Sequence, residues 1–145
     1  MKIVKAEAEH LDAMVALEQE CFTTPWSRNS FASEMENPDA HVTVAMDGEE
    51  VLGLSIFHRM GCEGELFNIA VWPKYRGRGI GKALLQDVLE NAKQNEVARI
   101  YLEVRRSNDP AREMYRKAGF QICGIRKNYY EAPTEDAVLM EAEIC

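Results

Sequence analysis

Arg76-Gly77-Arg78-Gly79-Ile80-Gly81-Lys82 is the stretch from which the rest of the chain is best interpreted. It stands between an apolar run at 66–71, which predicts a strand, and a segment at 82–93 with helical spacing. Three glycines in five positions let a backbone approach a ligand closely with its N–H groups pointing inward. The helix that begins there adds partial positive charge, and no acidic residue occurs between 66 and 86. The stretch predicts a cradle for a diphosphate. The alternative is a plain glycine-rich turn, since the spacing fits neither the P-loop nor the dinucleotide-binding fingerprint.

Hydrophobic periodicity predicts a mixed α/β sandwich around one sheet, with elements in the order βααβββαβαββ. The clearest helix, 82–93, carries Leu84, Leu85 and Val88 on one face. The clearest strand is 99–105, in which apolar residues alternate with Tyr101 and Glu103. The other expected elements are a strand at 2–5, a helix at 9–22, a short helix after Ser27, a hairpin of 41–46 and 51–58 about Asp47-Gly48, a turn at Gly61 and Gly64 before strand 66–71, a helix from Pro110 capped by Asn108 or Asp109 and ended by Gly119, and strands at 120–126 and 137–144. No repeat or linker divides the chain, so we expect one domain over residues 1–145.

Composition is that of a globular protein, with 46% hydrophobic and 28% charged residues in 145. Charge-free stretches are far shorter than the ~20 residues of a membrane span, and Glu7 precedes any apolar run at the N-terminus. We therefore expect a cytoplasmic chain with no membrane partner. The four cysteines and three histidines are widely separated and form no C-x-x-C, so we expect reduced thiols and no metal site.

Charge is distributed unevenly along the chain. Residues 1–73 hold 4 basic and 13 acidic side chains, residues 74–130 hold 13 basic and 6 acidic, and residues 131–145 add five acids. This asymmetry indicates one anionic and one cationic ligand, or merely a set of solvated surface charges. Because the whole chain carries a net charge of −7, a compact phosphate-bearing molecule fits the basic segment better than a nucleic acid does.

Several motifs together resemble a known family. Arg76-x-x-Gly79-x-Gly81 resembles the Gln/Arg-x-x-Gly-x-Gly/Ala acyl-CoA-binding loop of the GNAT N-acetyltransferases, and the expected order of elements is theirs. Further motifs are similar to those of the bacterial ribosomal-protein-alanine N-acetyltransferases, the RimI group: Phe22-x-x-Pro25-Trp26-Ser27, Leu66-Phe67-Asn68-Ile69-Ala70-Val71, Leu102-Glu103-Val104-Arg105-x-Ser107-Asn108-x-x-Ala111, Tyr115-x-x-x-Gly119-Phe120 and Arg126-x-x-Tyr129-Tyr130. The resemblance implies the GNAT fold and acetyl-CoA as co-substrate, with no metal.

Two residues carry the catalytic chemistry that the resemblance implies. Acetyl transfer from a thioester to an amine needs a base for the ammonium, an oxyanion donor and an acid for the thiolate. Glu103 would be the base, acting directly or through a water, although an ion pair with Arg99, Arg105 or Arg126 is the alternative. Tyr115 would be the acid, although its spacing alone favours a core aromatic.

The resemblance also implies the binding residues. The diphosphate would lie against Arg76, Gly77, Arg78, Gly79, Ile80, Gly81 and Lys82. Ile69, Ala70 and Val71 would pair through their backbone with pantetheine, and the Val71 N–H would be the oxyanion donor. Asn108 would reach the pantetheine arm or only cap a helix. Trp26, Tyr129 and Tyr130 would line the peptide entrance, if they are not simply core or surface aromatics.

The function implied is transfer of acetyl to the α-amino group of a protein N-terminus, the N-terminal alanine of a small-subunit ribosomal protein. The acidic residues of 1–73 and 131–145 suit such a cationic acceptor. The alternatives are an acetyltransferase of broader specificity, including lysine ε-amines, and a silent acyl-CoA-binding module. Because a binding module needs neither Glu103 nor Tyr115, the presence of both favours the enzyme.

Overall fold

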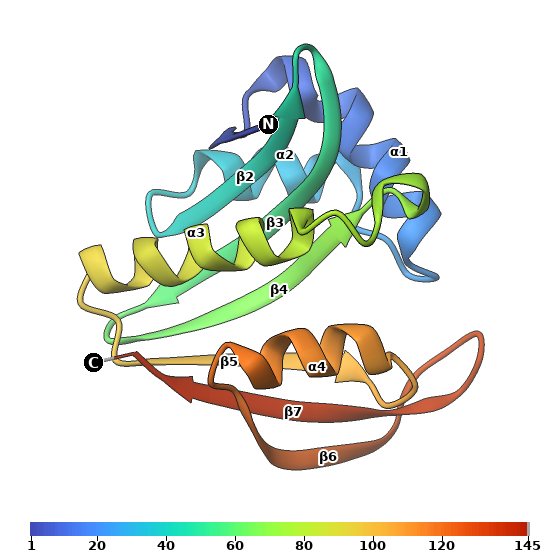
Figure 1. The fold of residues 1–145 in the computed structure, drawn as a ribbon, viewed down its shortest axis with the longest axis vertical. Helices are drawn as coiled ribbons and strands as arrows, with labels where there is room; N and C mark the ends of the chain where they lie inside the picture. Colours follow the sequence, from blue (N-terminus) through green and yellow to red (C-terminus); the bar gives the residue numbers. More distant parts are fainter. Residues whose placement is uncertain (145) are drawn as a thin grey trace.

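The computed structural model describes residues 1–144, and its order of elements matches the one predicted from periodicity (Figure 1). The strands are β1 (Lys2–Lys5), β2 (Ala40–Asp47), β3 (Glu50–Met60), β4 (Glu63–Val71), β5 (Arg99–Arg105), β6 (Gln121–Tyr130) and β7 (Glu135–Glu143). The helices are α1 (Leu11–Cys21), α2 (Arg28–Glu36), α3 (Ile80–Gln94) and α4 (Asp109–Lys117), with short 3-10 turns at Ala8–His10 and Pro73–Tyr75.

One sheet runs through the molecule in the order β1-β2-β3-β4-β5-β7-β6. All neighbouring strands are antiparallel except β4 and β5, which are parallel and pair only from Glu63 with Arg99 to Leu66 with Leu102. Beyond Leu66 the two strands separate, and Figure 1 shows β4 and β5 diverging toward the right. We call this opening the split; it places backbone that no neighbouring strand covers in the middle of the sheet.

A β-bulge marks the start of the split. In the β3–β4 pair, Phe57 faces Leu66 while Ile56 faces Asn68, so Phe67 is the extra residue. A bulge bends its strand and increases the local twist. The bend accounts for β4 turning away from β5 at this point.

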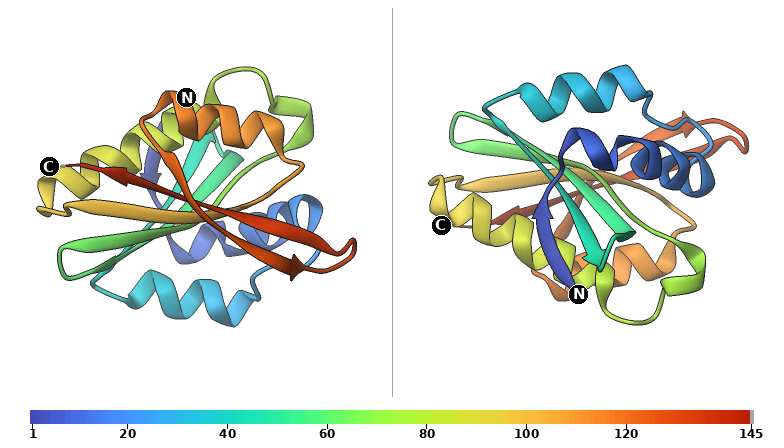
Figure 2. Two further views of the ribbon diagram at one scale, coloured as in Figure 1. Left: turned by 90° about the horizontal axis from the view of Figure 1, so that it is seen from below. Right: turned by 90° about the horizontal axis from the view of Figure 1, so that it is seen from above.

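Helices cover both faces of the sheet, with α1 and α2 on one face and α3 and α4 on the other (Figure 2). The face of α3 that periodicity predicted is the buried one, since Leu84, Leu85 and Val88 are at most 1% exposed. On β5 the alternation also holds, with buried residues facing α3 and α4 and Glu103 on the other face. Among residues 1–144, no helix has the length and apolar character needed to span a membrane.

Local turn chemistry is as expected at most positions and differs at one. Gly48 in the β2–β3 hairpin and Gly61 before β4 have φ of 60° and 63°, which favours glycine. Gly64, expected in a turn, lies inside β4 instead. A Cβ at Gly64 would lie 2.5 Å from the Phe57 ring, so close packing and not a turn requires glycine there.

Candidate active site

The glycine-rich stretch forms the connection into α3. Gly77 and Gly79 have φ of 81° and 80°, a region that L-residues other than glycine rarely adopt. Gly79 is the N-cap of α3, and the Ala83 N–H makes the first bond of the helix, to the Gly79 carbonyl at 3.0 Å. The N–H groups of the first turn therefore have no partner inside the helix and can bind an anion. A Cβ at Gly77 or Gly79 would meet no protein atom within 4 Å, so both face open space.

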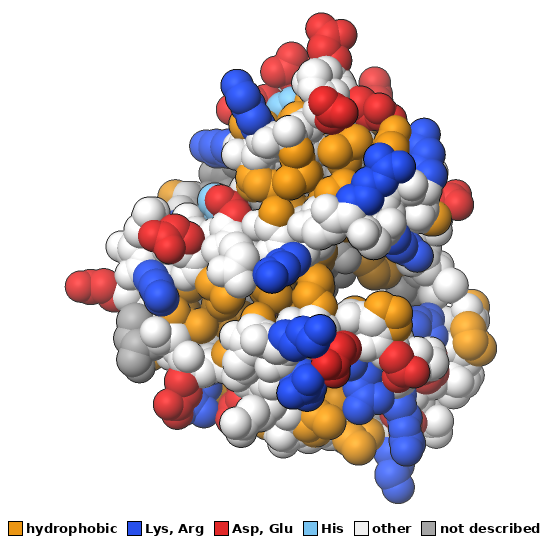
Figure 3. Space-filling view, viewed as in Figure 1, with side chains coloured by type: hydrophobic (Ala, Val, Ile, Leu, Met, Phe, Trp, Pro, Cys, Tyr) orange, Lys and Arg blue, Asp and Glu red, His pale blue; other side chains and the backbone are white. Residues whose placement is uncertain are grey.

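A cavity of about 590 Å³, which we call the large cavity, extends from this stretch into the split. Figure 3 shows a hollow between the start of α3 and α4, with Lys and Arg side chains above and below it. From the predicted cofactor-binding set, its lining includes Ile69, Ala70, Val71, Arg76, Gly77, Gly79, Ile80, Gly81, Lys82 and Asn108. Arg78 lies outside this lining, and its guanidinium carbon is 5.3 Å from the centre of the Tyr75 ring.

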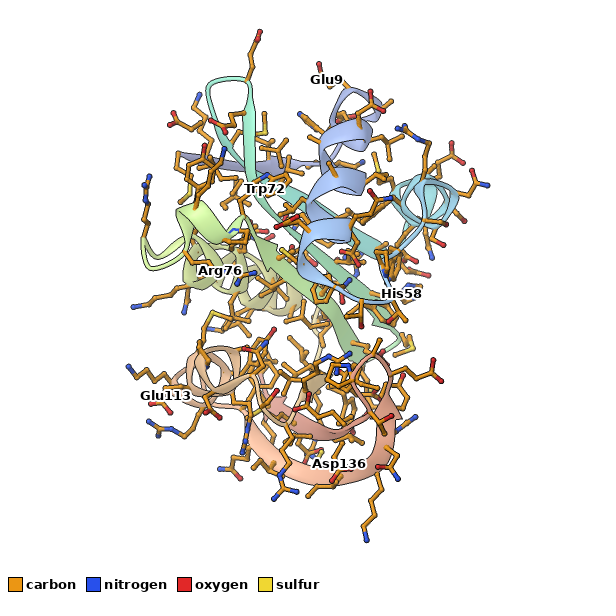
Figure 4. The ribbon with its side chains drawn as sticks, turned by 90° about the vertical axis from the view of Figure 1, so that its right-hand side faces the viewer. Glu9, His58, Trp72, Arg76, Glu113 and Asp136 are labelled. Carbon is orange, nitrogen blue, oxygen red and sulfur yellow. The ribbon has the colours of Figure 1, made fainter. Side chains whose placement is uncertain are left out.

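The backbone of β4 faces the split at Val71. The Trp72 N–H donates to the Leu52 carbonyl at 3.1 Å, and Val71 stands opposite Gly53 in the β3–β4 pair. Because successive residues of an antiparallel strand point their N–H and C=O groups to alternate sides, those of Val71 point away from β3 and into the split. The Val71 carbonyl accordingly accepts from Arg76 Nε at 3.2 Å. Arg76 lies at the edge of the opening above α4, which Glu113 marks (Figure 4).

A second cavity of about 230 Å³, the small cavity, opens on the α1 and α2 side of the split. Both predicted catalytic residues, Glu103 and Tyr115, line it. The two cavities share lining residues at the split: Cys21, Phe22, Ile69, Arg105, Asn108 and Ala111. A molecule in one cavity is therefore next to a molecule in the other.

Glu103 is part of the cavity wall and also makes an ion pair. Its side chain is 24% exposed, and Oε1 lies 3.4 Å from Arg126 Nε. The Glu103 charge raises the pKa of Tyr129. Of the other two cations considered from sequence, Arg105 pairs with Glu135, and Arg99 pairs with acids of β7. Glu103 therefore makes one of the ion pairs considered from sequence and still lines the small cavity.

Tyr115 is likewise both a core residue and a cavity residue. It is 7% exposed and its ring stacks edge-on against Phe120, with the centroids 5.6 Å apart. Burial raises the pKa of Tyr115 well above its ordinary value of 10. The hydroxyl therefore keeps its proton at neutral pH, as a proton donor must.

Known proteins resemble this chain in both sequence and structure. The model of the acetyltransferase (GNAT) family matches residues 11–120. The chain belongs to the GNAT acetyltransferase family. A relative in Bacillus subtilis (strain 168) is 39% identical over 91% of this chain and 88% of its own. The ribosomal protein bS18-alanine N-acetyltransferase of Escherichia coli (strain K12) is 35% identical over 98% of this chain and 97% of its own. The crystal structure of the E. coli ribosomal-protein-S18-alanine N-acetyltransferase superimposes with a TM-score of 0.91 at 34% identity, covering 99% of this chain and 93% of that one.

Membership of the GNAT family makes the protein an acetyl-CoA-dependent N-acetyltransferase. The large cavity fits this co-substrate in its chemistry, because a cradle of free N–H groups and basic side chains suits a diphosphate. The uncovered backbone of β4 suits an extended amide-bearing chain such as pantetheine. Asn108 caps α4, which is the alternative role considered for it from sequence, and accepts from the Ala111 N–H at 3.3 Å. Asn108 also lines both cavities.

The three aromatics predicted at the GNAT peptide entrance differ in position. Trp26 and Tyr130 line the small cavity, and the Trp26 ring packs against Phe67 with centroids 5.6 Å apart. Burial raises the pKa of Tyr130 to about 12, and the Arg105 guanidinium lies 4.6 Å from its ring centre. Tyr129 is 48% exposed and lies outside the cavity lining.

Sequence analysis missed one charged residue near this GNAT site, Glu18, and did not identify the contacts of a second, Arg105. Arg105 donates to the Glu131 carbonyl at 2.7 Å and to Thr23 Oγ1 at 2.9 Å, which ties the β6–β7 loop to the segment after α1. Glu18 is buried on α1 and bonds to the same region. A carboxylate among the apolar positions of an expected helix was the only signal for Glu18. The sequence offered Arg105 only as a partner for Glu103, because the partners that it has in the structure lie far from it along the chain.

Proposed function

We propose that this acetyltransferase acts on the α-amino group of a protein N-terminus, and that its substrate is the N-terminal alanine of a small-subunit ribosomal protein. The observation that carries the proposal is the junction of the two cavities, with Glu103 and Tyr115 on the wall of the smaller one. The named activity of the E. coli relatives, at 34–35% identity over nearly the whole chain, supports the choice of substrate.

Each chemical step has a group of this chain to perform it. Glu103 takes a proton from the α-ammonium, so that the amine nitrogen carries the electron pair that attacks the thioester carbonyl. The Val71 N–H, which points into the split, donates to the carbonyl oxygen as it becomes negative. When the carbon–sulfur bond breaks, the Tyr115 hydroxyl gives its proton to the coenzyme A thiolate, and the second proton that the nitrogen loses on becoming an amide restores that hydroxyl.

Charge supports a cationic protein as the acceptor. On its α1 side the small cavity is lined by residues from the acidic first part of the chain, and Glu103 adds a carboxylate to its wall, while the large cavity is bordered by Arg76 and Lys82. This distribution of charge favours an anionic co-substrate beside Arg76 and Lys82 and a basic acceptor beside Glu103. A ribosomal protein is such an acceptor, and we propose the cytoplasm as the place of action.

The deciding experiment measures thiol release from acetyl-CoA with two peptides of one sequence. One begins with a free Ala and carries an internal Lys, and the other has its N-terminus blocked. We expect release with the first peptide only, and we expect fragmentation in the mass spectrometer to place the added acetyl group on the α-amine. Acetylation of the internal Lys in both peptides would contradict the proposal and favour the lysine alternative.

A further inference from the structure

A buried carboxylate lies behind the wall of the small cavity. Glu18 is 0% exposed, and its Oε2 accepts from the Trp26 N–H at 3.0 Å and from Asn68 Nδ2 at 2.8 Å. Its Oε1 is buried and has no hydrogen-bond partner among residues 1–144. Burial raises the pKa of Glu18. Burying an acid costs free energy. The two hydrogen bonds of Glu18 join α1 to the segment after it and to β4, so we ask what this costly arrangement positions.

The contact with Glu18 fixes which way the Asn68 amide points. Glu18 Oε2 accepts from the Trp26 N–H, and a carboxylate oxygen has no proton to donate, so the group that Asn68 presents to it is the Nδ2 donor. Asn68 itself lines the small cavity, directly after the bulge at Phe67. Among the described residues no donor bonds to Asn68 Oδ1. Because this oxygen is not one of the buried side-chain atoms that lack a partner, it is accessible at the surface of the protein. The carbonyl oxygen is therefore the polar atom that Asn68 turns to the cavity.

We propose that Asn68 Oδ1 binds the acceptor by accepting a hydrogen bond from an N–H at its N-terminus, and that Glu18 is the residue that positions it. This inference rests on the proposed function, since it assumes that the acceptor enters the small cavity. A neutral oxygen complements the Glu103 carboxylate on the same wall, because an amine that has lost a proton to Glu103 still carries N–H donors. Glu18 prevents the amide from turning its donor toward an incoming amine.

Asn68 is well placed for a clean test because it lines the small cavity and is absent from the lining of the large one. Asn68→Leu keeps much of the shape and removes the oxygen together with the Nδ2 donor to Glu18. We expect kcat/KM for the Ala-starting peptide to fall about 10- to 100-fold, the range for one hydrogen bond lost at a desolvated site, with the Kd of acetyl-CoA within about twofold of wild type. Asn91→Leu is the matched control, because Asn91 is a half-buried asparagine that bonds to Arg59 away from both cavities.

Asn68→Asp tests the role of Glu18. Two carboxylates at one site share a proton, so the new side chain, when it holds that proton, donates to Glu18 as the amide did and still turns its carbonyl to the cavity. We expect this variant to keep more activity than Asn68→Leu, and its kcat/KM relative to wild type to fall as pH rises and the shared proton is lost. A residue that served packing alone would give the opposite order, because Leu packs better than a second buried acid.

The possible outcomes separate this inference from the proposed function. A wild-type enzyme without turnover on the Ala-starting peptide overturns the proposed function and this inference with it. Turnover that survives Asn68→Leu undiminished, or a Kd of acetyl-CoA that worsens as much as kcat/KM, overturns the role of Asn68 alone. Thermal unfolding of each variant identifies any loss that comes from a destabilised fold.

Discussion

Gly79→Val is the sharpest test of the cradle, because the structure separates strain from collision at this position. Gly79 has φ of 80°, and a Cβ there would meet no protein atom within 4 Å. The free protein therefore has room for a Cβ at this position, and the backbone conformation is what opposes a side chain there. An L-residue in the left-handed region costs ~1–2 kcal/mol, and a β-branched one at least that. We expect the loop to relieve this strain by turning its N–H groups away from the ligand.

Binding of acetyl-CoA must then restore the strained conformation, so the free energy of this strain is subtracted from the free energy of binding. At about 1.36 kcal/mol per factor of ten, a strain of ~1–2 kcal/mol raises the Kd of acetyl-CoA about 5- to 30-fold. Isothermal titration measures this Kd, and thermal unfolding shows whether the variant is folded.

Gly61→Val provides the matched control for strain. Gly61 has φ of 63°, also has no atom within 4 Å of a Cβ, and lies in the β3–β4 turn at the far end of the sheet from the cradle. We expect Gly61→Val to lower the free energy of unfolding about as much as Gly79→Val does, and to leave the Kd of acetyl-CoA within about twofold of wild type. A folded Gly79→Val protein with wild-type affinity would remove the stretch 76–82 from the binding site.

Three further substitutions test the groups around the small cavity. Glu103→Gln should lower kcat ~10²–10⁴-fold near neutral pH, with partial recovery as pH rises and the amine loses its proton unaided. The control Glu141→Gln also removes the carboxylate partner of an arginine, and it should leave kcat unchanged. Tyr115→Phe should lower kcat by ~10²-fold or more with no recovery at high pH and an unchanged Kd of acetyl-CoA; full activity would leave it a core residue. Glu18→Gln removes an acid whose pKa is raised in the folded protein. The free energy of unfolding of wild type should therefore fall relative to that of the variant as pH rises from about 4.5. Urea titrations measure this difference, and a difference that does not change with pH would contradict the raised pKa.

The features that could be predicted from the sequence are those that local chemistry determines. The glycine-rich stretch and the face of α3 follow from residues adjacent along the chain, and both are where periodicity placed them. The alternation of β5 put Glu103 on the opposite face from the core in the same way. The prediction for Gly64 was wrong because a glycine required by a neighbouring ring looks, in sequence, like a glycine required by a turn.

The split and the contact between Asn68 and Glu18 could not be predicted, because they depend on which residues meet across the sheet. The split exists because β4 bulges at Phe67 just where its pairing with β5 ends, and no periodicity reveals a register. The same bend brings Asn68 within 2.8 Å of Glu18, fifty positions earlier in the chain. Glu18 breaks the rule that a helix buries apolar side chains, and such violations gather at functional sites. A buried acid that contradicts the periodicity of its helix is therefore the kind of sequence signal that should direct attention to a site before its partners are known.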